Sequence, residues 1–309
     1  MEESLDKKPR STNKRRKRAK LIFNPGSGAA GESPVQLMDV ISEMQAWNLV
    51  PEAYLVEPEG DLESAVQNAL LDGIRMIAVC GGDGTIDAVA GMLAGKNATL
   101  GIIPTGTRNN VALSLGIPED ISAAIAILRT GRRIKVDTGQ VAYGSIKRSF
   151  LEFCSIGLVS SLYPSADDIQ HGDLARIGDF LATLVTSPPA EMHLVLDGKP
   201  QFENLCHVVL VSNMPYIGPH YQVGSPGSFS DGLLDVHVFA DLSKLELLGH
   251  AVQVVAGASE DPRVQRYQVR RANIDSQPAM PVMADGETVG EGRLSVRVQP
   301  RSLAVMVGK

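Results

Sequence analysis

Residues 76–85 read Met-Ile-Ala-Val-Cys-Gly-Gly-Asp-Gly-Thr, an apolar run that ends in a glycine-rich turn before a helix-like segment. Glycines let a backbone adopt positive φ and bring its N–H groups close to phosphate oxygens, and the positive end of the following helix adds to the attraction. Beside phosphates an acid such as Asp83 is unfavourable unless it holds a metal ion or a water, or accepts a proton. The stretch therefore predicts a strand, a phosphate-binding turn and a chemically active acid, with a plain strand-to-helix turn as the alternative.

Two further loops of small residues follow short apolar strands. Residues 24–28 read Asn-Pro-Gly-Ser-Gly after the strand 21–23, and residues 104–110 read Pro-Thr-Gly-Thr-Arg-Asn-Asn after the strand 100–103. In an open α/β sheet the carboxyl ends of the strands line one crevice, where ligands bind. One shared phosphate site explains these loops better than unrelated turns do.

The alternation of strands and helical segments predicts the fold class. From residue 19 to 136, short apolar strands alternate with segments of helical spacing, which is typical of a parallel sheet covered by helices. Helices are expected over 34–48, from Asp61 onward, and between an N-cap at Asp120 and a stop at Gly131. Residues 19–136 are therefore expected to form a Rossmann-like α/β domain that binds a nucleotide.

The second half, residues 137–309, has the texture of an antiparallel β-sandwich, with the nucleotide site in the cleft between the two domains. The last strand, 303–307, is a candidate to return to the first domain. The other strands are expected over 208–211, 234–239, 266–274 and 294–298, with helical segments near 173–185 and 244–256.

Composition agrees with two domains in a globular chain. The 309 residues exceed the size at which one core keeps growing, and 44% are hydrophobic. No apolar run reaches the roughly 20 residues of a membrane-spanning helix, and the beginning lacks the apolar stretch of a secretory signal, so a cytoplasmic protein is expected. Cys80, Cys154 and Cys206 lie in apolar runs without metal-ligand spacing, which indicates reduced core cysteines.

Charge is concentrated at the beginning of the chain. Residues 1–20 carry nine basic and three acidic side chains, a net +6, which leaves −12 for the remainder of a chain whose net charge is −6. Residues 1–18 are expected to be a disordered basic leader, either merely solvated or attracted to anionic lipid through residues 7–20. Nucleic acid is the weaker choice of partner, because the acidic remainder offers no basic patch to extend the contact.

Two acidic turns lie in the second half. Asp285-Gly286-Glu287 places two carboxylates around a glycine, and Ser230-Asp231-Gly232-Leu233 forms another turn. Aspartate before glycine is a common hairpin signal, so each is by itself a turn. Asp285 and Glu287 gain interest because a domain with phosphate loops and no obvious base needs one from across the cleft.

The order of these motifs resembles the diacylglycerol kinase catalytic-domain family, specifically its bacterial soluble lipid kinases. The resemblance covers nearly everything after residue 19. It rests on Asn-Pro-Gly-Ser-Gly (24–28), Gly-Gly-Asp-Gly-Thr (81–85), Gly-Ile-Ile-Pro-Thr-Gly-Thr-x-Asn (101–109), Asp137, Asp-Gly-Leu-Leu-Asp (231–235) and Asp-Gly-Glu (285–287).

The resemblance implies an ATP- and Mg²⁺-dependent kinase that phosphorylates a lipid hydroxyl, with diacylglycerol or a related lipid as substrate at the membrane surface. Asp83 and Asp137 resemble the carboxylates that organise the catalytic Mg²⁺ through water. Glu287 resembles the proton acceptor, with Asp285 beside it and Asp83 as a third candidate. A structural Mg²⁺ maps to Ser228, Asp231 and Leu233. The implied ATP contacts are Asn24, Pro25, Gly26, Ser27, Gly28, Gly81, Gly82, Asp83, Gly84, Thr85 and Thr107.

The chain departs from the family pattern at three positions. Asn110 stands where the family usually has an aspartate, Arg108 replaces a small residue, and Val56 replaces a frequent threonine. Each change removes or adds a charge or a hydroxyl near the phosphates, where one well-aimed group is worth on the order of 10² to 10³ in rate. A weakened or inactive lipid- or nucleotide-binding protein is therefore one alternative, and an enzyme like NAD kinase, which shares the Gly-Gly-Asp-Gly turn, is another.

Overall fold

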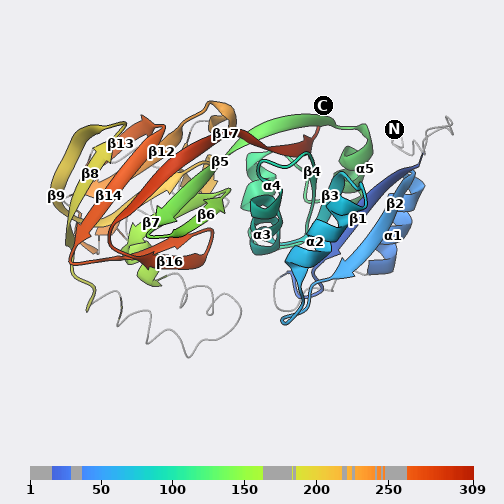
Figure 1. Ribbon diagram of the computed structural model, residues 1–309, viewed down its shortest axis with the longest axis horizontal. Coiled ribbons are helices and arrows are strands. Elements are labelled where there is room, and N and C mark those ends of the chain that lie inside the picture. The colour runs from blue at the N-terminus through green and yellow to red at the C-terminus, as the bar shows by residue number, and fades with distance from the viewer. Residues whose placement is uncertain are drawn as a thin grey trace, which may run out of the picture.

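The computed structural model describes residues 16–28, 37–162, 183, 186–217, 221–224, 227–240, 242–244, 246–247 and 263–309. Two parts, one rich in helices and one built of strands, are joined by long strands that run from one into the other (Figure 1). The expected leader and the helical segments near 173–185 and 244–256 lie largely outside these residues. In the part of the chain that is described, no helix is long and apolar enough to cross a membrane.

A parallel sheet forms the centre of the first part. The strands β1 (Lys17–Phe23), β2 (Leu49–Leu55), β3 (Met76–Gly81) and β4 (Thr99–Pro104) pair in the order β4-β3-β1-β2. Every residue of β3 and β4 is buried, as continuous apolar runs covered on both faces should be. Because the strands are parallel, the loops after β1, β3 and β4 emerge at the same edge.

Helices cover both faces of this sheet. The helices α1 (Leu37–Ala46) and α5 (Ile121–Thr130) pack on one face, and α2 (Leu62–Leu71), α3 (Asp83–Leu93) and α4 (Asn110–Ser114) pack on the other. The expected cap at Asp120 is confirmed, since its carboxylate accepts the backbone N–H of Ala123 at 2.8 Å. Asp61, where a helix was expected to begin, caps α2 in the same way through the N–H of Ser64 at 2.8 Å. Helix α5 ends at Gly131, as predicted.

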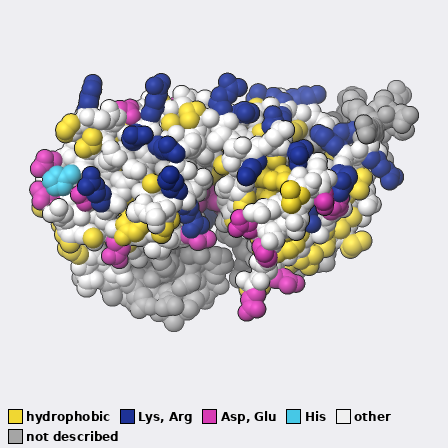
Figure 2. All heavy atoms as spheres, in the orientation of Figure 1, with side chains coloured by type: hydrophobic (Ala, Val, Ile, Leu, Met, Phe, Trp, Pro, Cys, Tyr) yellow, Lys and Arg dark blue, Asp and Glu magenta, His cyan; other side chains and the backbone are white. Residues whose placement is uncertain are grey.

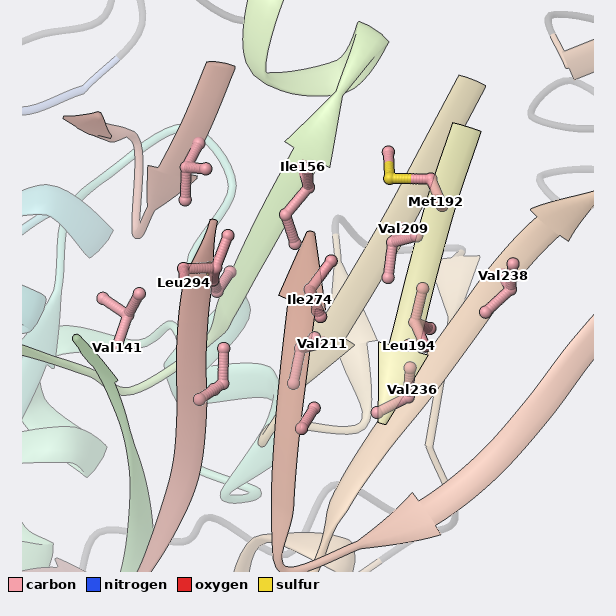
Figure 3. Packing of buried hydrophobic residues seen from close by; sticks show 14 of the residues in the cluster. Val141, Ile156, Met192, Leu194, Val209, Val211, Val236, Val238, Ile274 and Leu294 are labelled. Carbon is pink, nitrogen blue, oxygen red and sulfur yellow. The ribbon is translucent and has the colours of Figure 1, made fainter. Parts of the chain in front are cut away.

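Antiparallel strands form the second part, around a core of alternating inward-facing side chains such as Val209, Val236 and Ile274 (Figure 3). The α/β domain followed by a β-sandwich is therefore confirmed. The strands are β5 (Arg132–Tyr143), β6 (Ile146–Phe150), β7 (Phe153–Gly157), β8 (Ala190–Leu196), β9 (Lys199–Ser212), β10 (Tyr216–Ile217), β11 (Tyr221–Gln222), β12 (Leu234–Ala240), β13 (Val264–Val269), β14 (Arg271–Gln277), β15 (Pro281–Ala284), β16 (Glu287–Glu291) and β17 (Leu294–Val307), and the 3-10 helix η2 spans Ser228–Ser230.

Three expected strand boundaries were wrong. The strand expected over 208–211 is the end of the longer strand β9. The segment 266–274 is divided at Arg270 into β13 and β14, because the Asp197 carboxylate accepts the backbone N–H groups of Arg270 and Arg271 at 3.0 and 2.8 Å and turns the chain there. The segments expected as separate strands over 294–298 and 303–307 are one strand, β17, whose register shifts between Gln299 and Leu303. Such a bulge inserts residues without ending a strand.

The two parts are connected through β5 and β17. These strands pair antiparallel from Ser295 opposite Ala142 to Val307 opposite Arg132, and Val305 of β17 also pairs with Leu100 of β4. Side chains from the second part, including Leu151, belong to the hydrophobic core beneath α2 and α3. The two parts are thus held together by strand pairing and by a shared hydrophobic core.

Candidate active site

Hydrogen bonds join the three glycine-rich loops at the carboxyl edge of the sheet. The Asn24 amide Nδ2 donates to the Thr85 hydroxyl at 2.9 Å, which ties the loop after β1 to the turn after β3. The hydroxyls of Ser27 and Thr105 lie 2.6 Å apart, which ties the first loop to the loop after β4. Pro25 and Gly26 are exposed beside these contacts. Loops that are far apart in the sequence therefore form one surface.

Close backbone packing brings the second and third loops together. A Cβ on Gly106 would lie 2.5 Å from the Gly82 Cα, so only glycine fits. Asn109 adopts φ 50°, and its amide accepts from the Gly106 N–H and donates to the Gly106 carbonyl, both at 2.9 Å. Thr107 is left exposed at the tip. Asn109 was not predicted as a site residue, although asparagine is a residue type that tolerates this left-handed conformation.

Asp83 begins α3 and points at the beginning of α4. Its carboxylate accepts the backbone N–H groups of Asn110 at 3.1 Å and of Val111 at 3.3 Å. Burial raises the pKa of Asp83, and these hydrogen bonds and the charge of Arg108 act in the opposite direction. The acid that the sequence singled out thus connects the turn after β3 to the loop after β4.

Two acids that the sequence analysis missed, Asp87 and Glu152, lie beside Asp83. Burial raises the pKa of both carboxyls well above the ordinary value, and neighbouring acids, Asp285 among them, act in the same direction. A hydrogen bond between the two carboxyls raises the pKa of Asp87 and lowers that of Glu152. Asp87 follows Asp83 by four residues on one helix, and Glu152 interrupts an apolar run, so both signals were present in the sequence.

Asp285 closes this cluster from the sandwich. It forms a two-residue hairpin turn with Gly286, at φ 44° and 80°, as its sequence predicted. Its carboxylate accepts the backbone N–H groups of Leu151, Glu152 and Phe153 at 2.6, 3.0 and 3.0 Å. Burial raises its pKa to about 6.

Glu287, two residues further along the chain, is exposed at the beginning of β16. Its carboxylate forms an ion pair with Arg148 of β6 at 3.1 Å. The hairpin therefore presents one half-buried carboxylate, Asp285, which accepts backbone N–H groups, and one exposed carboxylate, Glu287, which pairs with an arginine.

The remaining predicted acids lie at the junction of β5 with η2. Asp137 is fully buried, and its carboxylate accepts the N–H groups of Arg301 at 2.6 Å and Gly232 at 2.7 Å. Asp231 accepts the N–H of Leu233 at 2.9 Å, and burial, followed by the charge of Asp137, raises its pKa. The Gly232 N–H thus ties Asp137 to the turn that carries Asp231.

The oxygen-rich donor set fits a divalent cation such as Mg²⁺, which prefers carboxylate and carbonyl oxygens. Asp87 Oδ1 and Asn110 Oδ1 are buried without a hydrogen-bond partner in the part of the chain that is described, and so is the Ser228 hydroxyl near Asp231. Buried polar atoms of this kind need a partner. A separate group, Glu191, His193 and Glu203, lies on β8 and β9 of the sandwich, with ligand atoms within 4.8 Å of one another.

Taken together, the joined loops and the adjacent acids are those of a phosphotransferase. Residues 18–141 match the model of the diacylglycerol kinase catalytic domain, and residues 166–307 match that of the YegS C-terminal NAD kinase beta sandwich-like domain. The first part of the chain is thus similar to a diacylglycerol kinase catalytic domain and the second to the sandwich domain of its relatives, which indicates a lipid kinase phosphotransferase.

Two curated relatives agree over nearly their whole length. A diacylglycerol kinase of Bacillus subtilis (strain 168) is 28% identical over 281 residues, which cover 89% of this chain and 91% of the relative. A diacylglycerol kinase of Staphylococcus carnosus (strain TM300) is 26% identical over 284 residues, which cover 89% and 90%.

Solved structures support the fold. The crystal structure of a diacylglycerol kinase from Bacillus anthracis superposes with a TM-score of 0.71 at 20% identity, covering 94% of this chain and 97% of that one. An NAD kinase from Archaeoglobus fulgidus, solved in complex with ATP, reaches a TM-score of 0.50 at 11% identity, covering 94% of each chain. The NAD kinase alternative is thus supported by a likeness of fold alone.

Proposed function

We propose that this chain transfers the γ-phosphate of ATP to the hydroxyl of diacylglycerol or a related lipid, in a reaction that requires Mg²⁺. The observation that carries the proposal is the meeting of three glycine-rich loops, joined by the Asn24–Thr85 and Ser27–Thr105 contacts, beside buried acids. Backbone N–H groups in such loops bind phosphate oxygens, and little else is needed for phosphoryl transfer beyond positioning and charge stabilisation.

In the proposed site the loops 24–28, 81–85 and 105–107 hold the phosphates. Asp83 and Asp137 are the proposed ligands of a catalytic Mg²⁺ through water, and Asp231 with Ser228 and Leu233 would hold a structural ion. When bound, Mg²⁺ would neutralise charge on the transferred phosphate. The raised pKa of Asp83 and of Asp231, for which burial is the largest cause, supports the assignment, because a bound cation would offset the cost of charging these acids.

The proposed general base is Glu287. Three carboxylates are candidates, but the oxygens of Asp83 and Asp285 already accept backbone N–H groups. Glu287 is exposed and its described contact is a salt bridge with Arg148, so its oxygens can reach a substrate hydroxyl once that contact opens.

The lipid substrate implies work at a membrane surface, and exposed basic side chains support this. The basic leader first suggested attraction to a membrane, and its residues 1–15 lie outside the described part of the chain. Among the described residues, Lys and Arg side chains line one long edge of the molecule (Figure 2). The expectation that the remainder of the chain offers no basic patch was therefore wrong. We name as the basic row the exposed residues Arg133 and Lys135 of β5, Arg271 of β14, and Arg297 and Arg301 of β17.

The test is transfer of labelled γ-phosphate from ATP to a panel of lipids in mixed micelles with Mg²⁺. Wild type should form a labelled lipid, and Glu287→Ala should form it at least 10²-fold more slowly, since general-base catalysis typically contributes that much. Glu119→Gln, at an exposed acid before α5, is the control and should match wild type. If no lipid is labelled although ATP binds, the chain is instead a binding protein that kept the fold.

A further inference from the structure

Asn110, where the family resemblance leads one to expect a carboxylate, contacts a carboxylate from elsewhere. Its side chain is 4% exposed, and its Nδ2 donates to Glu152 Oε2 at 2.9 Å. Because a carboxylate only accepts hydrogen bonds, the amide must turn its nitrogen to Glu152. Its Oδ1 is then directed away from Glu152, and it has no hydrogen-bond partner among the described residues.

The position of Glu152 is fixed by its backbone from both sides. The Asp285 carboxylate holds the N–H groups on either side of Glu152 and that of Glu152 itself. The Glu152 carbonyl accepts from the Asn213 N–H at 2.9 Å and the Met214 N–H at 3.2 Å, and Asn213 Nδ2 donates to the Leu151 carbonyl at 2.8 Å. The hairpin β15–β16 and the end of β9 thus hold this carboxylate at the wall of the first domain.

Burial and the charges of Asp83 and Asp285 raise the pKa of Glu152 well above its ordinary value, and hydrogen bonds at its side chain act in the opposite direction. A bound cation would favour the charged form further, because an opposite charge nearby stabilises a carboxylate. The Asn110 amide is a donor toward it, and the Asp87 carboxyl shares a hydrogen bond with it. A carboxylate that accepts from an amide polarises that amide and makes its oxygen a better acceptor or ligand. Asn110 Oδ1 therefore carries part of the negative charge of Glu152 to the side of the amide that faces away from Glu152.

We propose that Asn110 and Glu152 act as one unit that replaces the family's single carboxylate. Asn110 Oδ1 would supply the oxygen that contacts the hydrated cation. Glu152 orients the amide and, in the ionised form that the bound cation favours, would supply the charge. Glu152 is a positioning residue in this scheme. The inference rests on the proposed function, and it removes Asn110 as a reason to expect an inactive protein.

If Asn110 were merely a defect in the motif, changing it back to aspartate should raise activity. The proposed unit predicts the opposite. Asn110→Asp alone would place two carboxylates in contact at the distance of the present 2.9 Å hydrogen bond, so it should not raise activity. The double change Asn110→Asp with Glu152→Gln moves the charge across the same hydrogen bond, with Gln now the donor. That double variant should recover what each single change loses.

The experiment compares wild type, Glu152→Gln, Asn110→Asp and the double variant, with Glu119→Gln as the control. Lipid phosphorylation gives kcat and KM, calorimetric titration gives ATP affinity with and without Mg²⁺, and thermal unfolding reports folding. Glu152→Gln and Asn110→Asp should each lower kcat by at least tenfold. The kcat of the double variant should be at least tenfold higher than the value expected if the two changes acted independently. The Mg²⁺-dependent gain in ATP affinity should fall in the single variants and return in the double variant. Glu152→Asp serves where Glu152→Gln does not fold.

Two results would overturn the unit. In one, Glu152→Gln keeps wild-type kcat and Mg²⁺-dependent ATP affinity. In the other, the double variant recovers thermal stability but not the Mg²⁺ dependence, as a purely structural pair would. A wild type that labels no lipid, yet shows this coupling in ATP binding, would contradict the proposed function and leave the unit standing.

Discussion

At the residue scale, the buried acids predict how the metal-free protein responds to pH. Burial raises the pKa of Asp285 from 3.8 to about 6 and raises those of Asp87 and Glu152 well above their ordinary values. Between the unfolded and folded pKa values the folded state holds protons that the unfolded state has lost, so its stability falls as pH rises. Without Mg²⁺, the thermal midpoint should therefore fall as pH rises from about 4 through 6 and further toward neutrality.

Asp87→Asn should flatten this slope and stabilise the metal-free protein near pH 7.5 by on the order of 1 kcal/mol, because one buried acid is gone. Asp39→Asn, at an exposed acid in the first turn of α1, is the matched control and should leave the slope as it is. Differential scanning fluorimetry across pH measures both. A wild type whose midpoint rises over this range would show that these acids are compensated by other charges.

At the element scale, the approach of the loop after β4 to the turn after β3 predicts a steric effect on nucleotide binding. In Gly106→Ala the new Cβ would meet the Gly82 Cα at 2.5 Å, and because that atom is backbone, one loop must move. ATP affinity should fall by at least tenfold, since misplaced phosphate contacts are expensive. Gly91→Ala, in α3 with open space around it, is the control. Equal ATP affinities in calorimetry would mean that the loops do not contact phosphate together.

The same loops indicate how far the sequence predicted the site. Local signals were sufficient for elements whose cause is local, such as the Asp120 cap and the Asp285-Gly286 turn. The acids Asp87 and Glu152 were missed because their importance arises from tertiary contact between α3 and the start of β7. β17 was divided in two because a bulge leaves the same break in an apolar pattern as a loop does.

At the scale of the whole molecule, the basic row is predicted to dock the enzyme on anionic membranes. Arg271 lies directly opposite Arg297 on the neighbouring strand. Two like charges in such a pair repel each other and destabilise the sheet. An anionic surface would relieve this repulsion, and each basic side chain near it is worth about 1 kcal/mol, roughly fivefold in binding.

Lys135→Ala should therefore weaken sedimentation with phosphatidylserine vesicles about fivefold at low salt, and Lys135→Ala with Arg271→Ala about 30-fold. Lys199→Ala, at the exposed beginning of β9, removes the same charge outside the row and should change binding less. A chain that lacks residues 1–15 distinguishes the row from the leader. If the row variants bind vesicles like wild type and the shortened chain binds less, docking depends on the leader alone. Phosphorylation of the same lipid in detergent micelles without anionic lipid should be equal in all these proteins, because Lys135 and Arg271, the row residues that are changed, are exposed and are not among the acids that the proposed chemistry uses.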